Sequence, residues 1–264
     1  MIKKILQKFL KLLGYKITKF NTVDTVDLDK MTMLLINKKE PIIFDVGANH
    51  GQSIERYKKL YQNSQIHSFE PNKKQYEIIE SKFKDDESVY YNNVGIADKA
   101  GTLELNINAT PGHSSFKNIV PDTTWLKKRS ITAGVDIKDY TLQKFQSKMI
   151  TLDTYCEENK IKQIDILKID VQGFEDKVLD GAQNLLKASK IKLIQLELIF
   201  TEIYEKPLSI YDVEKFLIPN KYKLFGISNA GSLISDYIYQ QNHIYISEDI
   251  YIQFKTIQKK KNNL

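Results

Sequence analysis

The stretch DVGANHG, from Asp45 to Gly51, constrains the fold of this chain more than any other. It follows the apolar run 41–44, and an apolar run that ends in an acidic residue and glycines predicts a buried strand, a tight turn and a helix. Gly47 and Gly51 permit a positive φ and a close approach to a ligand, and Asn49 tolerates such a turn. The pattern favours a nucleotide-binding turn, although ordinary strand–loop connections share it.

A helix that contains Ser53 is predicted after the turn. A second predicted strand, 65–69, follows this helix, and the strand ends at Glu70. A right-handed crossover places the ends of both strands on the same side of the sheet. Glu70 lies 19 residues beyond Gly51, where an acidic side chain can accept hydrogen bonds from both ribose hydroxyls of a nucleotide. The two motifs together therefore predict a nucleotide site at this edge.

Two more carboxylates follow predicted strands at 164–170 and 192–198, where Asp170 and Glu197 stand near the strand ends. Lys168 precedes Asp170 by two residues and shares its face, and a lysine inside a parallel strand is costly unless it is paired. We therefore expect a Lys168–Asp170 polar pair. In a doubly wound sheet ligands bind outside the carboxyl ends of the strands, so the strand-end carboxylates should gather there, although each could instead cap a helix.

The remaining pattern predicts strands at 89–93, 102–107 and 148–152, and an antiparallel pair near 222–227 and 243–247. The long segment 108–137 between them is more typical of a lid or a substrate-binding region than of a plain connection. It contains His113, a candidate general base, although a single loop histidine is usually solvated.

The chain has 264 residues, 42% of them apolar, which suffices for one α/β domain. We place this domain at 40–250, between an N-terminal helical extension, 1–39, and a basic tail, 251–264. No apolar run approaches the roughly 20 residues of a membrane span. The single cysteine and the lack of a secretory pattern favour a cytoplasmic protein. The net charge of +6 is spread along the chain, which argues against a nucleic-acid partner.

Residues 1–13, MIKKILQKFLKLL, place apolar side chains on one side and four lysines on the other. This pattern predicts an amphipathic helix. The helix can pack on the domain or rest on an anionic membrane, where each nearby lysine contributes about 1 kcal/mol. A weak peripheral contact with the inner face of the membrane is therefore one expectation. The sequence does not predict an oligomeric state.

These motifs resemble those of the FkbM-type S-adenosylmethionine-dependent methyltransferases. The resemblance spans about residues 40–250 and is carried by FDVGANHGQS, FEP, TLDTYC, IDILKIDVQGFE and LELIF. It implies the class I methyltransferase fold, a Rossmann-like, doubly wound α/β fold whose seven-stranded sheet is mostly parallel with an antiparallel last strand. It also implies O-methylation of a sugar, glycan or related metabolite. The family often has Glu where this chain has Gln172, which removes a possible base or metal ligand.

By this resemblance, the turn holds the methionine part of S-adenosylmethionine, Glu70 holds the ribose, and the segment 93–98 flanks the adenine. The implied cofactor-binding residues are Asp45, Gly47, Asn49, Gly51, Ser53, Glu70, Asn93 and Ala97. Asp170 is the candidate nearest to the methyl group and the acceptor oxygen, with Glu197 and His113 as further catalytic candidates. No metal ligand is assigned, although a divalent cation bridging Asp170 and Glu197 is conceivable.

Three functions remain open on the residues alone. An O-methyltransferase aligns donor and acceptor for in-line displacement and excludes water, with a carboxylate to take the hydroxyl proton. A nicotinamide (NAD)-dependent oxidoreductase could use a similar turn, but DVGANHG lacks the second glycine of G-x-G-x-x-G. A non-catalytic scaffold in glycan assembly could keep the fold alone.

Overall fold

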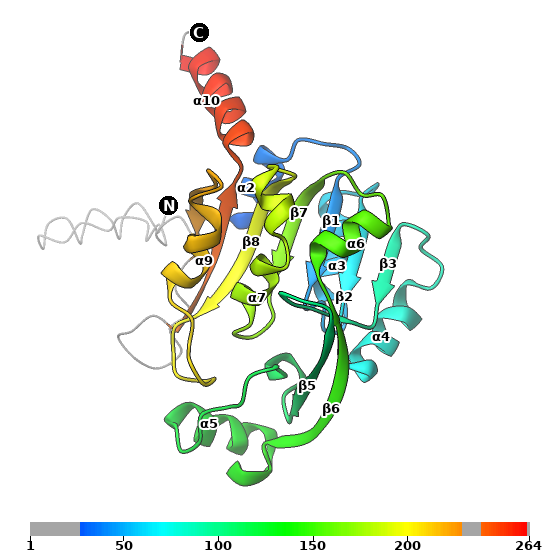
Figure 1. The fold of residues 1–264 in the computed structure, drawn as a ribbon, viewed down its shortest axis with the longest axis vertical. Helices are drawn as coiled ribbons and strands as arrows, with labels where there is room; N and C mark the ends of the chain where they lie inside the picture. The colour runs from blue at the N-terminus through cyan, green and yellow to red at the C-terminus, as the bar shows by residue number, and fades with distance from the viewer. Residues whose placement is uncertain (1–26, 229–238, 263–264) are drawn as a thin grey trace, which may run out of the picture.

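A seven-stranded sheet forms the centre of the computed structural model, which describes residues 27–228 and 239–262 (Figure 1). The strand order is β3-β2-β1-β7-β8-β10-β9, and β10 alone runs in the direction opposite to the other six strands. This is the predicted class I methyltransferase sheet with its last strand antiparallel. The strands are β1 (Ile42–Val46), β2 (Gln65–Phe69), β3 (Val89–Asn92), β7 (Ile164–Ile169), β8 (Ile191–Ile199), β9 (Lys223–Ile227) and β10 (Gln240–Ile246).

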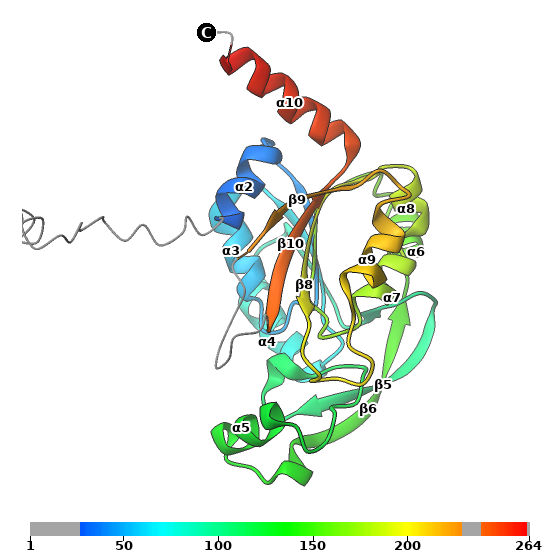
Figure 2. The ribbon, with the colours of Figure 1, turned by 90° about the vertical axis from the view of Figure 1, so that its left-hand side faces the viewer.

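Helices cover both faces of this sheet (Figure 2). One face carries α2 (Leu28–Leu35), α3 (Gln52–Leu60), α4 (Lys73–Phe83) and the start of α10 (Glu248–Asn262). The other carries α6 (Leu152–Glu158), α7 (Glu175–Asp180), α8 (Gln183–Lys187) and α9 (Ile210–Leu217). Because both faces are covered, every residue of β7 is buried, as expected of a central parallel strand.

A second sheet extends beyond the carboxyl ends of the main strands (Figure 1). It has the order β4-β6-β5 and consists of β4 (Gly95–Ile96), β5 (Gly101–Asn108) and β6 (Thr141–Ile150). The connection from β5 to β6 contains α5 (Thr124–Ala133) and two single 3₁₀ turns, η1 (Pro111–His113) and η2 (Ile137–Asp139). The segment predicted as a long loop is thus partly helical, and the short strand predicted at 148–152 is the end of a strand of 10 residues.

The N-terminal extension, expected to be helical at 1–39, contains α2 within its described residues. This helix begins after Asp27, whose side chain accepts a hydrogen bond from the Lys30 amide. At the other end, α10 crosses the expected start of the basic tail without a break and projects from the body (Figure 1).

The amphipathic helix expected at 1–13 lies outside the described residues, so its contact with a membrane stays a prediction. Within 27–228 and 239–262, none of the helices combines the length and the apolar character that crossing a bilayer requires.

Candidate active site

The DVGANHG turn joins β1 to α3, and its predicted special positions adopt the left-handed backbone. The φ angle is 81° at Gly47, 49° at Asn49 and 89° at Gly51. Gly47 lies against the end of β7, because a Cβ atom at this position would lie 1.9 Å from the carbonyl oxygen of Asp170. Gly51 instead faces Phe83, so its small size serves the packing of α3 on α4. The tight turn predicted from the sequence is therefore confirmed.

Glu70 ends β2 with its carboxylate directed at this turn. Its Oε2 accepts a hydrogen bond from the backbone N–H of Asn49, and its Oε1 accepts one from the backbone N–H of Asn72, both at 2.8 Å. Burial raises the pKa of Glu70 to about 7, and the two N–H groups oppose that shift. Glu70 thus holds the turn in place and lines the pocket described below.

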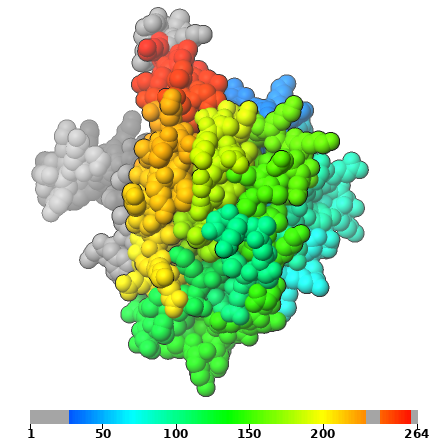
Figure 3. Space-filling model, in the orientation of Figure 1, coloured from blue at the N-terminus to red at the C-terminus, as the bar shows by residue number. Residues whose placement is uncertain are grey.

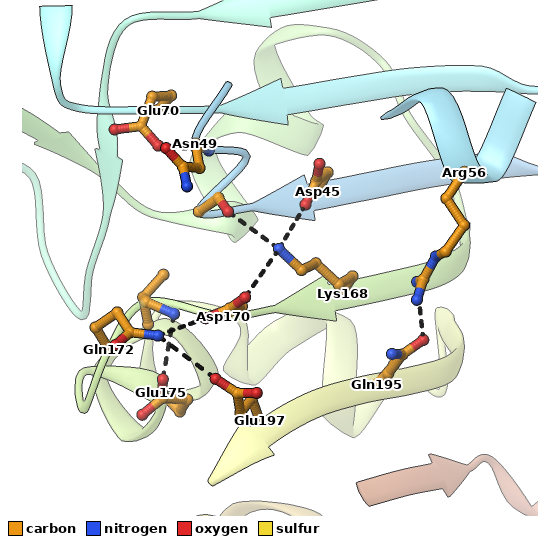
Figure 4. Close-up of polar contacts among 12 residues, drawn as sticks. Asp45, Asn49, Arg56, Glu70, Lys168, Asp170, Gln172, Glu175, Gln195 and Glu197 are labelled. Atoms are coloured by element: carbon orange, nitrogen blue, oxygen red, sulfur yellow. Dashed lines mark hydrogen bonds and ion pairs between the residues drawn. The ribbon is translucent and has the colours of Figure 1, made fainter. Parts of the chain in front are cut away.

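Lys168 joins the DVGANHG turn to the end of β7 (Figure 4). Its Nζ lies 3.0 Å from Asp45 Oδ1, 3.0 Å from the carbonyl oxygen of Gly47 and 3.5 Å from Asp170 Oδ2. Burial opposes the charge of Lys168, but the two carboxylates raise its pKa. The predicted Lys168–Asp170 pair is present, and the completely buried Asp45 is the nearer partner. Asp45 therefore holds Lys168 beside the turn, and its role in cofactor binding stays a prediction.

Gln172 connects the two predicted catalytic carboxylates (Figure 4). Its Nε2 donates to Asp170 Oδ1 at 2.9 Å and lies 3.5 Å from Glu197 Oε2. Its Oε1 accepts from the hydroxyl of Tyr204 at 3.1 Å, and its φ of 57° marks a tight turn. The other oxygen of Glu197 accepts from Gln240 Nε2 at 2.9 Å. An amide thus stands where the family often has a carboxylate.

This amide also occupies the position that a bridging cation would need between Asp170 and Glu197. Among the residues that the structure describes, no group of three or more His, Cys, Asp or Glu side chains is arranged to hold a metal ion.

Glu175 holds the turn that follows β7 much as Glu70 holds the DVGANHG turn. Its Oε1 accepts from the backbone N–H groups of Val171 and Gly173, both at 3.2 Å. Burial raises its pKa to about 7. The sequence reasoning assigned no role to Glu175, although the residue closes the motif IDILKIDVQGFE. The two buried glutamates therefore shape both turns that face the pocket.

A pocket with an empty volume of about 640 Å³, its open mouth included, lies at the carboxyl ends of β1, β2 and β7. This is the edge at which the sequence predicts ligand binding. Glu70 and Asp170 contribute its carboxylates. Its apolar wall is formed by Val46, Phe69, Val94, Ile96, Leu105, Phe116, Val171 and Phe174.

The segment 111–116, here called the cap, closes one side of this pocket, to which all its residues except His113 contribute. Ser115 pairs with Asn106 of β5 through two backbone hydrogen bonds of 2.9 and 3.2 Å, and its Oγ donates to the carbonyl oxygen of Gln172 at 2.8 Å. The hydroxyl of Tyr204 donates to the carbonyl oxygen of His113, also at 2.8 Å. Part of the predicted substrate region thus reaches the pocket, but no sequence pattern indicated which part.

His113 points away from the pocket lining. Its Nδ1 lies 2.9 Å from the hydroxyl of Tyr140, and its ring centroid lies 5.0 Å from that of Trp125. Burial lowers its pKa to about 4, the charge of Arg129 acts in the same direction, and Asp170 opposes both. His113 is therefore a neutral, anchored side chain at pH 7, and its role as a base stays a prediction.

The other predicted residues divide between the pocket and its surroundings. Gly47, Asn49 and Glu70 line the pocket, as does Asp170 among the catalytic candidates, whereas Glu197 lies behind Gln172. The remaining predicted cofactor residues outside the lining are Gly51, Ser53, Asn93 and Ala97.

The structure gives Asn93 and Ala97 other contacts. The Asn93 amide donates to the carbonyl oxygens of Glu70 and Pro71, and the Ala97 carbonyl packs against Gly181. Val94 and Ile96, their neighbours, face the pocket instead.

Three glutamates, the buried Glu70 and Glu175 and the half-buried Glu197, predict how stability depends on pH. The pKa values of Glu70 and Glu175 are raised to about 7, and that of Glu197 to about 8 by burial together with Asp170 and Glu175. Above pH 4.5 the native state therefore holds protons that the unfolded chain has released, so these groups lower the free energy of unfolding as pH rises towards 8. Urea unfolding of the wild type at pH 5.5 and pH 8 should show this loss.

Glu197→Gln removes the group with the largest of these shifts and should flatten the pH dependence. Glu202→Gln, at an exposed position, is the matched control and should leave the dependence as in the wild type. Equal slopes for the wild type and Glu197→Gln would contradict the prediction.

Comparison with known proteins adds a family and two curated relatives. The model of the methyltransferase FkbM domain matches residues 45–227. The 2-O-methyltransferase NoeI of Sinorhizobium fredii is 24% identical over 191 residues, which cover 70% of this chain and 74% of NoeI. Methyltransferase sdnD of Sordaria araneosa is 26% identical over 200 residues, which cover 61% of this chain and 76% of sdnD.

A solved rRNA methylase from Streptococcus thermophilus is 9% identical, with a TM-score of 0.46, and the match covers 86% of this chain and 99% of that protein. A similarity at this level adds nothing to the family match.

Proposed function

Because this chain belongs to the FkbM methyltransferase family and is an S-adenosylmethionine-dependent methyltransferase, we propose that its acceptor is a hydroxyl group of a sugar or glycan. The observation that carries this proposal is the Asp170 carboxylate in the pocket wall, where it can take the proton of an attacking hydroxyl. A relative described as a 2-O-methyltransferase supports the same acceptor chemistry. Family membership sets aside the oxidoreductase and the scaffold.

The residues of the pocket fit S-adenosylmethionine. Gly47 lines the pocket and approaches the end of β7 so closely that a Cβ atom there would overlap the carbonyl group of Asp170, so only glycine lets the turn take this position beside a ligand. The Glu70 carboxylate can accept further hydrogen bonds from ribose hydroxyls, because each of its oxygens has used one acceptor position on a backbone N–H. The apolar wall, with Phe69 and Ile96 among its members, suits an adenine ring.

When bound, S-adenosylmethionine supplies a methyl group on a positively charged sulfur. The protein has to orient the acceptor oxygen in line with the methyl carbon and exclude water. Asp170 is the proposed proton acceptor, held by Lys168 and Gln172. Burial together with Asp170 and Glu175 raises the pKa of Glu197, which favours its protonated form and makes it less suited to take a proton.

The proposal is tested by incubating the protein with isotopically labelled S-adenosylmethionine and a panel of sugars, nucleotide sugars and glycan fragments. We expect a methyl ether on a hydroxyl group, identified by mass spectrometry, with equimolar release of S-adenosylhomocysteine. Transfer only to nitrogen or carbon acceptors in a parallel panel would overturn the proposal.

Glu70→Ala should weaken binding of S-adenosylhomocysteine by about 1.5–3 kcal/mol, because the ribose hydroxyls lose a charged acceptor. The Asn49 N–H also loses its partner, which adds to the effect through the turn. Titration calorimetry measures the change. Glu77→Ala, an exposed position on α4, is the matched control. An unchanged affinity in Glu70→Ala would remove Glu70 from the cofactor site.

A further inference from the structure

Arginine is rare in this chain, and its two positions differ in their surroundings. The chain has 39 lysines and arginines, of which only Arg56 and Arg129 are arginines. Arg56 Nη2 donates to Gln195 Oε1 at 3.3 Å, and Arg56 Nη1 lies 3.7 Å from Asp29 Oδ1. Within the described residues, Arg129 has no carboxylate at ion-pair distance. Among the described residues, Arg129 therefore lacks a carboxylate partner such as the one that Arg56 has in Asp29.

Arg129 lies on α5 and contacts an aromatic ring. Its guanidinium carbon is 6.0 Å from the ring centroid of Trp125, the residue one helical turn earlier. The indole N–H of Trp125 donates to the Tyr239 hydroxyl. The contact with Trp125 does not neutralise the charge of the guanidinium.

The contacts of Trp125 place Arg129 on the side of the pocket where the catalytic candidates lie. The Trp125 ring centroid lies 5.0 Å from that of His113 in the cap, and its indole N–H donates to the hydroxyl of Tyr239. Tyr239 precedes Gln240, whose Nε2 donates to Glu197. Besides burial, the pKa of His113 responds to Arg129, which lowers it, and to Asp170, which raises it. The pKa of Tyr239, raised by burial, is likewise lowered by Arg129 and raised by Glu197. The pKa values of His113 and Tyr239 thus both respond to the Arg129 guanidinium. Each also responds to one strand-end carboxylate, His113 to Asp170 and Tyr239 to Glu197.

The part of the chain that carries α5 is also joined to the segment after β8. Ile119 forms a β-bridge with Tyr204, and the Val120 N–H donates to the carbonyl oxygen of Ile203 at 2.9 Å. On the molecular surface the two parts meet without a gap between the green and yellow segments (Figure 3). The segment that leads into α5 is therefore packed against the segment after β8.

We propose that Arg129 binds an oxyanion, a carboxylate or a phosphate, that the acceptor sugar carries. This inference rests on the proposed function. The planar guanidinium presents paired N–H donors that match two oxygens of such a group, which a lysine cannot do. Asp170 disfavours an anionic acceptor, so a cation on this side of the pocket offsets its repulsion. The net charge of +6 also favours the approach of an anionic acceptor.

The test compares sugars that differ only in the anionic group. Glucose is paired with glucuronic acid, galactose with galacturonic acid, and methyl glucoside with glucose 1-phosphate, with release of S-adenosylhomocysteine as the readout. We expect the wild type to prefer an anionic member by about 10- to 100-fold in kcat/KM, the range of a charge-assisted hydrogen bond. The uronic acids and the sugar phosphate separate the carboxylate from the phosphate.

Arg129→Gln should abolish this preference and leave the rate with the neutral sugars within about twofold, and Arg129→Lys should restore only part of it. Lys128→Gln makes the same change of charge at an exposed neighbouring position and should keep the preference. Calorimetry should find the same affinity of Arg129→Gln and wild type for S-adenosylhomocysteine.

Three results would overturn the inference while the proposed function stands: equal rates with neutral and anionic sugars, a preference that survives Arg129→Gln, or a loss of S-adenosylhomocysteine affinity in that variant. The last would assign Arg129 to the cofactor. If no sugar of either kind is methylated, the proposed function fails and the inference fails with it.

Discussion

Gly47→Ala is expected to lower the affinity for S-adenosylhomocysteine by about 100-fold or more. The added Cβ would lie 1.9 Å from the carbonyl oxygen of Asp170 and 2.8 Å from its carbonyl carbon, both of them backbone atoms that cannot rotate away. Overpacking of this kind costs about 1–3 kcal/mol, and a positive φ costs a residue with a side chain about 1–2 kcal/mol more. To relieve the overlap, the first turn has to move away from β7 and out of its binding geometry.

Gly134→Ala is the control that separates the two costs. Gly134 has a φ of 69°, similar to the 81° of Gly47, but a Cβ atom there meets nothing within 4 Å. It should show a loss of stability of about 1 kcal/mol in thermal unfolding and normal binding in calorimetry. Circular dichroism establishes whether Gly47→Ala is still folded when it has lost binding. If the two variants bind alike, the turn does not form the cofactor site.

Much of the fold follows from patterns that lie within short stretches of the sequence. β1 and β7 are predictable because each is a short apolar run that ends in an acidic residue and a glycine-containing turn. The Lys168–Asp170 pair is predictable because residues two apart in a strand share a face. The shared position of the strand-end carboxylates follows from the topology of a doubly wound sheet.

In the β5–β6 ribbon, β5 matches the strand predicted at 102–107, whereas β6 is hard to predict because it has little apolar pattern. Most residues of β6 are exposed or half-buried, so no alternation marks its ten residues. α5 did carry start and stop signals that the sequence reasoning missed. The Thr123 side chain caps its first turn by accepting from the Leu126 N–H, and Gly134 follows its end with a positive φ.

The acceptor side of the site could not be predicted because its contacts join residues distant in sequence. The hydrogen bond from Ser115 to Gln172 spans 57 residues, and that from Tyr204 to His113 spans 91. Gln172 itself was noted only as a missing carboxylate. Its function as a link between Asp170 and Glu197 depends on a tight turn that the residue type alone does not predict.

Asp170→Asn is expected to lower kcat by about 10²- to 10⁴-fold, the contribution of a positioned general base, and to change the affinity for S-adenosylhomocysteine by less than about threefold. Asparagine keeps the size of the side chain and an oxygen that can accept from Gln172, and Lys168 keeps its nearer partner, Asp45. The fold and the cofactor pocket should therefore persist while the proton acceptor is lost.

Single-turnover transfer to an acceptor identified in the sugar panel measures the chemical step apart from product release, and calorimetry measures the affinity. Glu197→Gln is the informative comparison, because Gln172 contacts both carboxylates and either could take the proton by geometry alone. Burial and the neighbouring carboxylates raise the pKa of Glu197 and so favour its protonated form, and its neutral replacement should therefore retain most of the rate. A normal rate for Asp170→Asn with a large loss for Glu197→Gln would transfer the proton acceptor to Glu197.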